Sequence, residues 1–161
     1  VTHDQEEAMS MADRIAVMSR GEVKQIGTPI ELYSNPESTY IADFVGTSNI
    51  LKGTVIGEEN GLTLVQVNGF QILSAAKIDK KEVDIVIRPE NIKLVEDGEP
   101  HENILDGKIL LSTYLGSIVR YDIQVGEYTL LMDTTYQAGD KILPANSNIK
   151  VSIHPERVLL I

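Results

Sequence analysis

The sequence predicts a mainly β protein with a short α+β segment at its N-terminus. Two observations predict this class. Helix-start signals are confined to the residues before position 47, and from Asn49 onward apolar stretches are separated by Asn-Gly pairs. Because Asn-Gly readily takes the positive φ angles of a type I′ turn, each such pair predicts a hairpin of two antiparallel strands.

The first expected helix begins at Asp4. Asp4 followed by Glu7 is a capping-box pattern, in which the Asp side chain accepts the N–H of the third helical residue. Apolar side chains then recur at helical spacing. The residues expected on this helical face are Ala8, Met11, Ala12 and Ile15.

A hairpin and two more short helices are expected next. Arg20-Gly21 separates the short apolar segment 14–19 from segment 22–27, which predicts a tight hairpin. Thr28, Pro29 and Glu31 are an N-cap, an N1 proline and an N3 acceptor, so a helix is expected to start there and to stop at Asn35-Pro36. Segment 38–44 predicts a third helix, with Gly46 as its C-cap.

Strands dominate the remainder of the chain. Asn60-Gly61 and Asn68-Gly69 predict hairpins that join strands at about 50–56, 62–67 and 70–73. A further strand is expected at 83–87. Gly126-Glu127 predicts a hairpin between strands 119–125 and 128–132.

A weak internal repeat organises these strands. Segment 49–55 resembles 103–109, and segment 87–92 resembles 153–158. Both ends match in the same order, which favours a true repeat over chance similarity between strand-rich segments. We expect two five-stranded units like those of the OB (oligonucleotide/oligosaccharide-binding) barrel, and the two units could share strands.

Composition excludes several classes of function. Acidic residues outnumber basic ones by 24 to 14, giving a net charge of −10, whereas nucleic-acid binders need Lys and Arg to neutralise phosphates. No apolar run approaches the roughly 20 residues that a membrane-spanning helix needs. The chain has no cysteine, and its three histidines lack metal-ligand spacing. We therefore expect no nucleic-acid partner, no direct membrane insertion and no bound metal.

His3 is the residue most informative about function. It follows an extended Val1-Thr2 and immediately precedes the helix capped by Asp4. A histidine between a strand end and a helix N-terminus can donate a hydrogen bond to a phosphate oxygen. By itself the position is a weak signal, and an ordinary surface histidine is the simpler interpretation.

The residues around His3 resemble a known family. The ordered phrases of segment 1–36 closely resemble the end of the nucleotide-binding domain of ABC importer ATPases. The match runs without a gap over about residues 1–46, and it is carried by the phrases VTHDQEEAM (1–9), ADRIAVM (12–18), GEVKQIGTP (21–29) and ELY (31–33). The remainder, 47–161, is similar to the regulatory OB-type (TOBE) domain of these proteins, on the phrases IRPE (87–90) and YLGS (114–117). The whole is most similar to spermidine/putrescine importers; iron, thiamine and sugar importers have related C-terminal regions.

The resemblance implies a function for each part. It implies that His3 is the catalytic switch histidine, which contacts the γ-phosphate of ATP. It implies ATP and magnesium as cofactors of the intact subunit, a homodimer stabilised by residues 47–161, transmembrane permease partners, and a cytoplasmic, peripheral location on the inner face of the membrane.

The chain is expected to be inactive on its own. It reads as a fragment, because it starts in the middle of a recognisable phrase. Its sequence contains no Gly-x-x-x-x-Gly-Lys-Ser/Thr loop, no Leu-Ser-Gly-Gly-Gln signature and no strand that ends in Asp-Glu. Phosphoryl transfer depends on positioning and charge stabilisation by those parts, so ATP hydrolysis is expected only from an intact subunit.

Other candidate residues have simpler interpretations. Arg88 and His154 occupy matching places in the two repeats; they could contact a ligand, but exposed strand-end side chains are the simpler interpretation. Gly116-Ser117 could bind an oxyanion through backbone N–H groups, although a turn explains it better. We expect Met9, Met11 and Met18 to be packing residues, and Glu58-Glu59 and Glu96-Asp97 to lie in solvated loops.

Two other classes remain open from the sequence alone. A free-standing OB module that binds a small ligand such as an oxyanion would account for 47–161 but not for 1–46. An oligonucleotide-binding OB protein would account for the fold, but such proteins need basic strand faces and exposed aromatic side chains.

Overall fold

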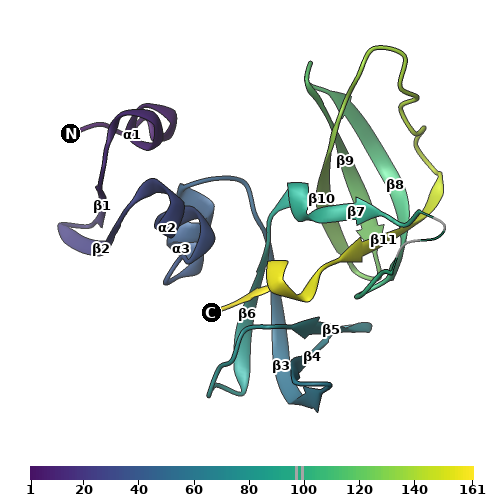
Figure 1. Ribbon diagram of the computed structural model, residues 1–161, viewed down its shortest axis with the longest axis horizontal. Coiled ribbons are helices and arrows are strands. Elements are labelled where there is room, and N and C mark those ends of the chain that lie inside the picture. Colours follow the sequence, from purple (N-terminus) through teal and green to yellow (C-terminus); the bar gives the residue numbers. More distant parts are fainter. Residues whose placement is uncertain (97, 99) are drawn as a thin grey trace. The chain divides into compact units, whose positions relative to one another are not determined.

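A computed structural model of the chain describes residues 1–96, 98 and 100–161 (Figure 1). Asp97, one of the residues expected in a solvated loop, lies outside the described residues. The chain divides into two compact units, Val1–Ser48 together with Ile161, and Asn49–Leu160. The sequence placed the boundary at 46/47. Each unit is described by itself below.

The first unit begins with helix α1, Gln5–Met11. The side chain of Asp4 accepts the backbone N–H of Glu7 at 3.0 Å, which confirms the predicted N-cap. The helix ends earlier than expected, because Ala12 takes an extended conformation (φ −97°, ψ 136°). The prediction that Ile15 belongs to the helical face is therefore wrong; Ile15 starts a strand.

The methionines of this unit are mostly not packing residues. Helix α1 contains no buried residue, and Met11 is 78% and Met18 58% exposed. The prediction of packing is therefore wrong for these two side chains. Met11 ends the short helix α1 and Met18 lies in a two-stranded hairpin, and among the described residues no other element covers either side chain.

The predicted hairpin is confirmed. Strand β1 (Ile15–Ser19) pairs with β2 (Glu22–Gly27), joined by Arg20 (φ 53°) and Gly21 (φ 79°). Two consecutive positive φ angles are those of a type I′ turn.

Two capped helices follow the hairpin. Helix α2 (Pro29–Ser34) has the complete capping box: Glu31 N–H donates to the Thr28 hydroxyl, and Thr28 N–H donates to the Glu31 carboxylate at 2.8 Å. These bonds, the backbone N–H of Thr28 first, hold the pKa of Glu31 below its ordinary value. Helix α3 (Thr39–Phe44) starts at Ser38 as expected. The hydrophobic core of this unit consists of Val17, Leu32, Ile41 and Val45, with Ile15, Tyr33 and Phe44 packed against it.

The end of α3 differs from the prediction. The helix is capped by Val45, which keeps a right-handed conformation (φ −86°, ψ −5°). Gly46 is not among the residues with positive φ. The predicted left-handed glycine cap is therefore not formed, because the last helical turn is already closed by the bond from Val45 N–H to Ile41 O.

The second unit contains two five-stranded antiparallel sheets within its described residues. In the first sheet the strand order is β12-β6-β3-β4-β5, and in the second it is β10-β9-β8-β11-β7. The first sheet comprises β3 (Asn49–Glu59), β4 (Leu62–Val67), β5 (Phe70–Ser74), β6 (Glu82–Ile87) and β12 (Leu159–Leu160). The second comprises β7 (Ile92–Leu94), β8 (Leu105–Tyr114), β9 (Ile118–Val125), β10 (Tyr128–Thr135) and β11 (Asn148–Ile153).

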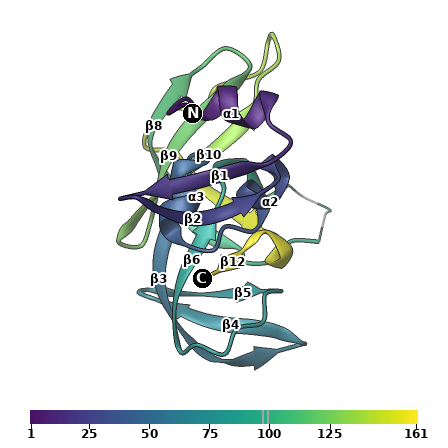
Figure 2. The ribbon, with the colours of Figure 1, turned by 90° about the vertical axis from the view of Figure 1, so that its left-hand side faces the viewer.

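The two repeats exchange their last strands. Strand β7 follows the 3₁₀ turn η1 (Pro89–Asn91) of the first repeat but pairs with β11 of the second, with Lys93 opposite Ser152 (Figure 1). Strand β12 follows η2 (Pro155–Arg157) of the second repeat but pairs with β6 of the first, with Leu159 opposite Val86 (Figure 2). The expectation of two OB-like units with shared strands is thereby confirmed.

Equivalent details extend the repeat beyond the matching segments. Strand β3 has a register shift between Val55 and Gly57, and β8 has one between Ile109 and Leu111, at the corresponding position. A bulge at this place increases the local twist, which helps a short sheet to curl into a barrel. One hydrophobic core, with Ile85, Ile87, Ile109, Ile123 and Ile153 at its centre, is shared by both sheets.

The Asn-Gly turns are formed, with one difference. Asn60 (φ 51°) and Gly61 (φ 81°) form the expected type I′ pair. At the second turn only Gly69 (φ 94°) is left-handed, so the prediction of a type I′ turn is wrong there. The side chain of Asn68 donates instead to Glu127, in the corresponding turn of the second repeat.

Candidate functional site

His3 lies on the surface, directly before the N-cap of α1. Asp4 N–H donates to the Thr2 hydroxyl at 3.0 Å, which holds the backbone around His3 in a local turn. The extended strand expected at Val1-Thr2 is not formed, because among the described residues of this unit only β1 and β2 pair with each other.

The surroundings of His3 do not make an ATP site. The nearest charged side chains in sequence are Asp4, Glu6 and Glu7, and Asp4 already caps the helix. Three carboxylates close to His3 in sequence disfavour an anion, so a γ-phosphate at His3 requires cations from other parts of the subunit. The residues present therefore do not fit ATP by themselves, and within the described residues no group of three His, Asp or Glu could hold a metal ion. The assignment of His3 as a phosphate-contacting residue stays a prediction.

Arg88 and His154, which match in the repeat, lie in different environments. Arg88 is 3% exposed, so the interpretation as an exposed strand-end side chain is wrong for it. The reason is that the end of β6 is covered on both faces, with Ile85, Val86 and Ile87 all buried. His154 is exposed as expected, and its Nε2 lies 3.8 Å from the Glu102 carboxylate.

Gly116-Ser117 forms a turn between β8 and β9. Gly116 has φ 89°, and Leu115 N–H donates to Ile118 O at 2.9 Å across the turn. Ser117 O accepts the N–H of Tyr136. The turn interpretation is thereby confirmed.

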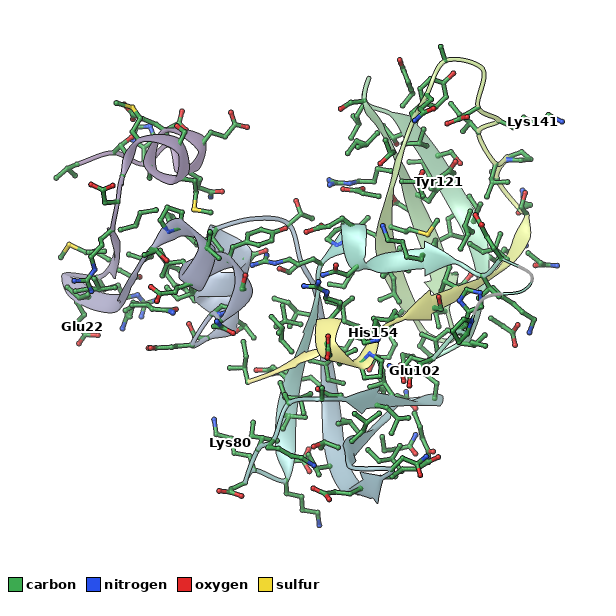
Figure 3. The ribbon with its side chains drawn as sticks, in the orientation of Figure 1. Glu22, Lys80, Glu102, Tyr121, Lys141 and His154 are labelled. Carbon is green, nitrogen blue, oxygen red and sulfur yellow. The ribbon has the colours of Figure 1, made fainter. Side chains whose placement is uncertain are left out.

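An open pocket of about 960 Å³ lies in the second unit. It lies along β7 and β11 and continues to the loop that connects β10 with β11. Its polar lining includes Lys93, His101, Glu102, Lys141, Ser152, His154 and Arg157, and its apolar lining includes Leu94, Val119, Tyr121 and Leu143. Figure 3 shows Glu102 and His154 next to each other, and Lys141 on the loop with its amino group directed away from the sheet.

Hydrogen bonds fix two parts of the pocket wall. The Tyr121 hydroxyl accepts the N–H of Leu143 at 3.3 Å, and the Ser112 hydroxyl donates to Leu143 O at 2.6 Å, which holds the loop against the barrel. On the other side, His101 Nδ1 is 3.3 Å from the Ser152 hydroxyl, and His101 Nε2 is 2.8 Å from Glu96 O.

A partly buried ion pair joins the neighbouring strands β9 and β10. Arg120 donates to Asp133 with two parallel bonds of 2.8 Å, across directly paired positions of β9 and β10. The hydrogen bond with Asp133 raises the pKa of Arg120 above its ordinary value, against the opposing effect of burial. The guanidinium therefore stays charged at every physiological pH.

Of the pocket residues, sequence reasoning singled out only His154 as a possible ligand contact. Lys93, His101, Ser152 and Arg157 lie in three separate segments of the sequence. They come together because β7 leaves its own repeat and pairs with β11. The repeat suggested shared strands but not which strand pairs with which, so no local signal could have located this pocket.

Residues 85–161 match the family model of the TOBE domain. In solved structures the fold resembles that of the cytoplasmic molybdate-binding protein ModG, in a form with molybdate bound. The TM-score is 0.59 at 18% sequence identity, covering 70% of this chain and 94% of that chain. This likeness concerns the fold alone.

Over most of its length the chain is homologous to ABC importer ATP-binding proteins, and it corresponds to a region of them that carries a TOBE domain. It is 37% identical over 157 residues to the spermidine/putrescine import ATP-binding protein PotA of Desulfitobacterium hafniense, covering 92% of this chain and 43% of that protein. It is 36% identical over 162 residues to the Fe(3+) ions import ATP-binding protein FbpC of Rhizobium etli, covering 100% of this chain and 44% of that protein. The chain thus spans less than half the length of these relatives. None of its described helices has the length and hydropathy to cross a membrane.

Proposed function

We propose that this chain is the C-terminal part of the ATPase subunit of an importer for polyamines. The observation that carries the proposal is the similarity to spermidine/putrescine import ATP-binding proteins, which covers 92% of the chain at 37% identity in the Desulfitobacterium hafniense relative. A relative from Trichormus variabilis with the same name is 39% identical over 132 residues.

Import of ferric iron is a second candidate. It is favoured by the Rhizobium etli relative, which is 36% identical and covers the whole chain. The difference of one percentage point between the two relatives does not decide between the solutes.

The two parts of the chain have different proposed roles. Residues 1–46 form the end of the nucleotide-binding domain and supply His3, which contacts the γ-phosphate of ATP in the intact subunit. Residues 47–161 form the regulatory domain, which stabilises the pairing of two subunits. Permease subunits hold the complex at the cytoplasmic face of the membrane. Apart from the contact of His3 with the γ-phosphate, ATP and magnesium are bound by parts of the subunit other than this chain.

ATP hydrolysis by the reconstituted complex tests the proposal. The complete subunit, its permease and its solute-binding protein are placed in proteoliposomes. Hydrolysis is then measured with the binding protein loaded with spermidine, putrescine or ferric iron. Stimulation by the polyamines and not by iron is expected; stimulation by iron alone would replace the polyamine assignment with the iron assignment.

A further inference from the structure

We propose that Thr2 is a positioning residue for His3, because its hydroxyl fixes the backbone bend at which His3 lies. The inference rests on the proposed function, in which the His3 imidazole contacts the γ-phosphate of ATP in the intact subunit. It follows from the hydrogen bonds on both sides of His3 and from the lack of a partner for the imidazole among the described residues.

The hydrogen bond of the Thr2 hydroxyl spans His3. The hydroxyl oxygen accepts the backbone N–H of Asp4 at 3.0 Å. A threonine hydroxyl that accepts the N–H two residues further along closes a small local turn, and the chain bends at His3 accordingly. Because the bond joins the residue before His3 to the residue after it, it restricts the backbone torsions of His3 and therefore the direction of the imidazole.

The other end of this turn is anchored to helix α1. The side chain of Asp4 accepts the N–H of Glu7 at 3.0 Å, and the backbone oxygen of Asp4 accepts the N–H of Ala8 at 3.1 Å. Figure 2 shows the N-terminus directly beside α1. The Thr2 hydroxyl thus connects the residue before His3 to the first turn of the helix.

The imidazole of His3 has few other constraints. The side chain is exposed, and its ring nitrogens form no hydrogen bond or ion pair within the part of the chain that the structure describes. Helix α1 contains no buried residue, so packing contributes little to holding this segment. A group that acts on a transition state must be held within about 0.5 Å of its productive position. The bond from Asp4 N–H to the Thr2 hydroxyl is the feature of this chain that meets this need.

A direct contact between Thr2 and the nucleotide is the alternative role. A hydroxyl that accepts the N–H of Asp4 still has its own proton to donate, and a phosphate oxygen could accept it. The two roles differ in a double-mutant cycle. A residue that acts through His3 has no further effect once the imidazole is removed, whereas a residue with its own contact to ATP keeps its effect.

ATP hydrolysis and equilibrium ATP binding by the complete subunit, assembled with its permease, test the inference. Thr2→Val removes the hydroxyl at nearly unchanged side-chain size; it is expected to lower kcat about tenfold through misplacement of the imidazole, at unchanged ATP affinity. Thr2→Ser keeps the hydroxyl and should retain most of kcat. In the His3→Ala background, Thr2→Val should cause no further loss. Ser10→Ala is the matched control, because the Ser10 hydroxyl donates to Glu7 O at 3.2 Å within α1 and does not span His3; it should leave kcat unchanged.

Four results would overturn the inference while leaving the role of His3 intact. Unchanged kcat in Thr2→Val would show that the hydroxyl is not needed. An equal loss in Thr2→Ser would assign the effect to side-chain packing, and an equal loss in Ser10→Ala would assign it to the stability of α1. A further loss from Thr2→Val in the His3→Ala background would give Thr2 its own contact with the nucleotide. Unchanged kcat in His3→Ala alone would instead overturn the proposed role of His3 and this inference together.

Discussion

The side chain of Asn49 binds both backbone polar groups of Leu131. Asn49 Oδ1 accepts the N–H of Leu131 at 2.7 Å, and Asn49 Nδ2 donates to Leu131 O at 2.9 Å. Leu131 lies in β10, an edge strand of the second sheet, whereas Asn49 is the first residue of β3 in the first sheet. The asparagine amide thus takes the place that a neighbouring strand would occupy.

Asn103, in the second repeat, makes the equivalent pair of hydrogen bonds to the first repeat. Its Oδ1 accepts the N–H of Leu73 at 2.7 Å, and its Nδ2 donates to Leu73 O at 2.8 Å. Leu73 lies in β5, an edge strand of the first sheet. Each repeat therefore starts with an asparagine that closes the open edge of the other repeat.

We predict that Asn49→Ala lowers the free energy of unfolding by about 1–3 kcal/mol, because it leaves two partly buried backbone groups without a protein partner. Urea unfolding followed by circular dichroism measures the change. Asn148→Ala is the control, since Asn148 is exposed and forms no side-chain hydrogen bond among the described residues. Equal stability of the two variants would show that the Asn49 bonds do not contribute.

The same test at Asn103 needs a second variant. Asn103 has φ 47°, so alanine adds backbone strain to the loss of the hydrogen bonds. Asn103→Gly removes the bonds without the strain, and it is expected to be destabilised less than Asn103→Ala but more than Asn148→Ala.

Gly53 and Gly107, at corresponding positions of the repeats, leave room for core side chains. A Cβ at Gly107 would lie 2.6 Å from Ile123 Cγ2, and one at Gly53 would lie 2.5 Å from Val65 Cγ1. We predict that Gly107→Ala and Gly53→Ala each destabilise the unit by about 1–3 kcal/mol through overpacking. Thr129→Ala, on the exposed face of β10, serves as the control in thermal unfolding. Unchanged melting temperatures for both glycine variants would contradict the packing described here.

Self-association of the chain is the third prediction. We expect a homodimer whose dissociation constant falls as salt is raised toward physiological strength, because the net charge of −10 repels a second copy most strongly at low salt. Exposed apolar side chains such as Leu111 and Leu115 offer a contact surface on the second unit. Sedimentation equilibrium at two salt concentrations measures the association.

A trimmed chain that starts at Ser48 separates two origins of the dimer. Within residues 1–47, Ile26 is 54% exposed and offers an apolar contact to a second copy, whereas Val17 is buried within its own unit and cannot contribute. A dimer that persists after trimming is expected. A dimer lost on trimming would assign the association to residues 1–47, and a monomer at high protein concentration in both salts would contradict the prediction.

Local signals in the sequence predicted the elements well, because their causes are local. The caps of α1 and α2 and the turn at Asn60-Gly61 each depend on a few neighbouring residues. The strand exchange, the burial of Arg88 and the composition of the pocket depend on pairing between β7 and β11 and between β12 and β6. Which strands pair depends on how all the core side chains pack together. The sequence therefore indicated two OB-like units, but it could not locate the pocket along β7 and β11.

His3 is expected to act in the transition state of hydrolysis in the complete subunit. We predict that His3→Ala lowers kcat by roughly a hundredfold while the affinity for ATP stays nearly unchanged, as for loss of a group that acts mainly on the developing charge. Steady-state hydrolysis and equilibrium nucleotide binding are measured on the same preparation. A large rise in KM at unchanged kcat would assign His3 to ground-state binding instead.

Spermidine uptake by a chimeric importer tests the central claim most directly. The region of the Desulfitobacterium hafniense relative that aligns with this chain is replaced by this chain, and uptake of labelled spermidine is measured in cells that lack their own importer ATPase. We predict that the chimera restores ATP-dependent uptake and that the chimera with His3→Ala does not. A chimera that is produced, binds ATP and assembles with its permease, yet takes up no spermidine, would contradict the assignment of this chain to the C-terminal part of such a subunit.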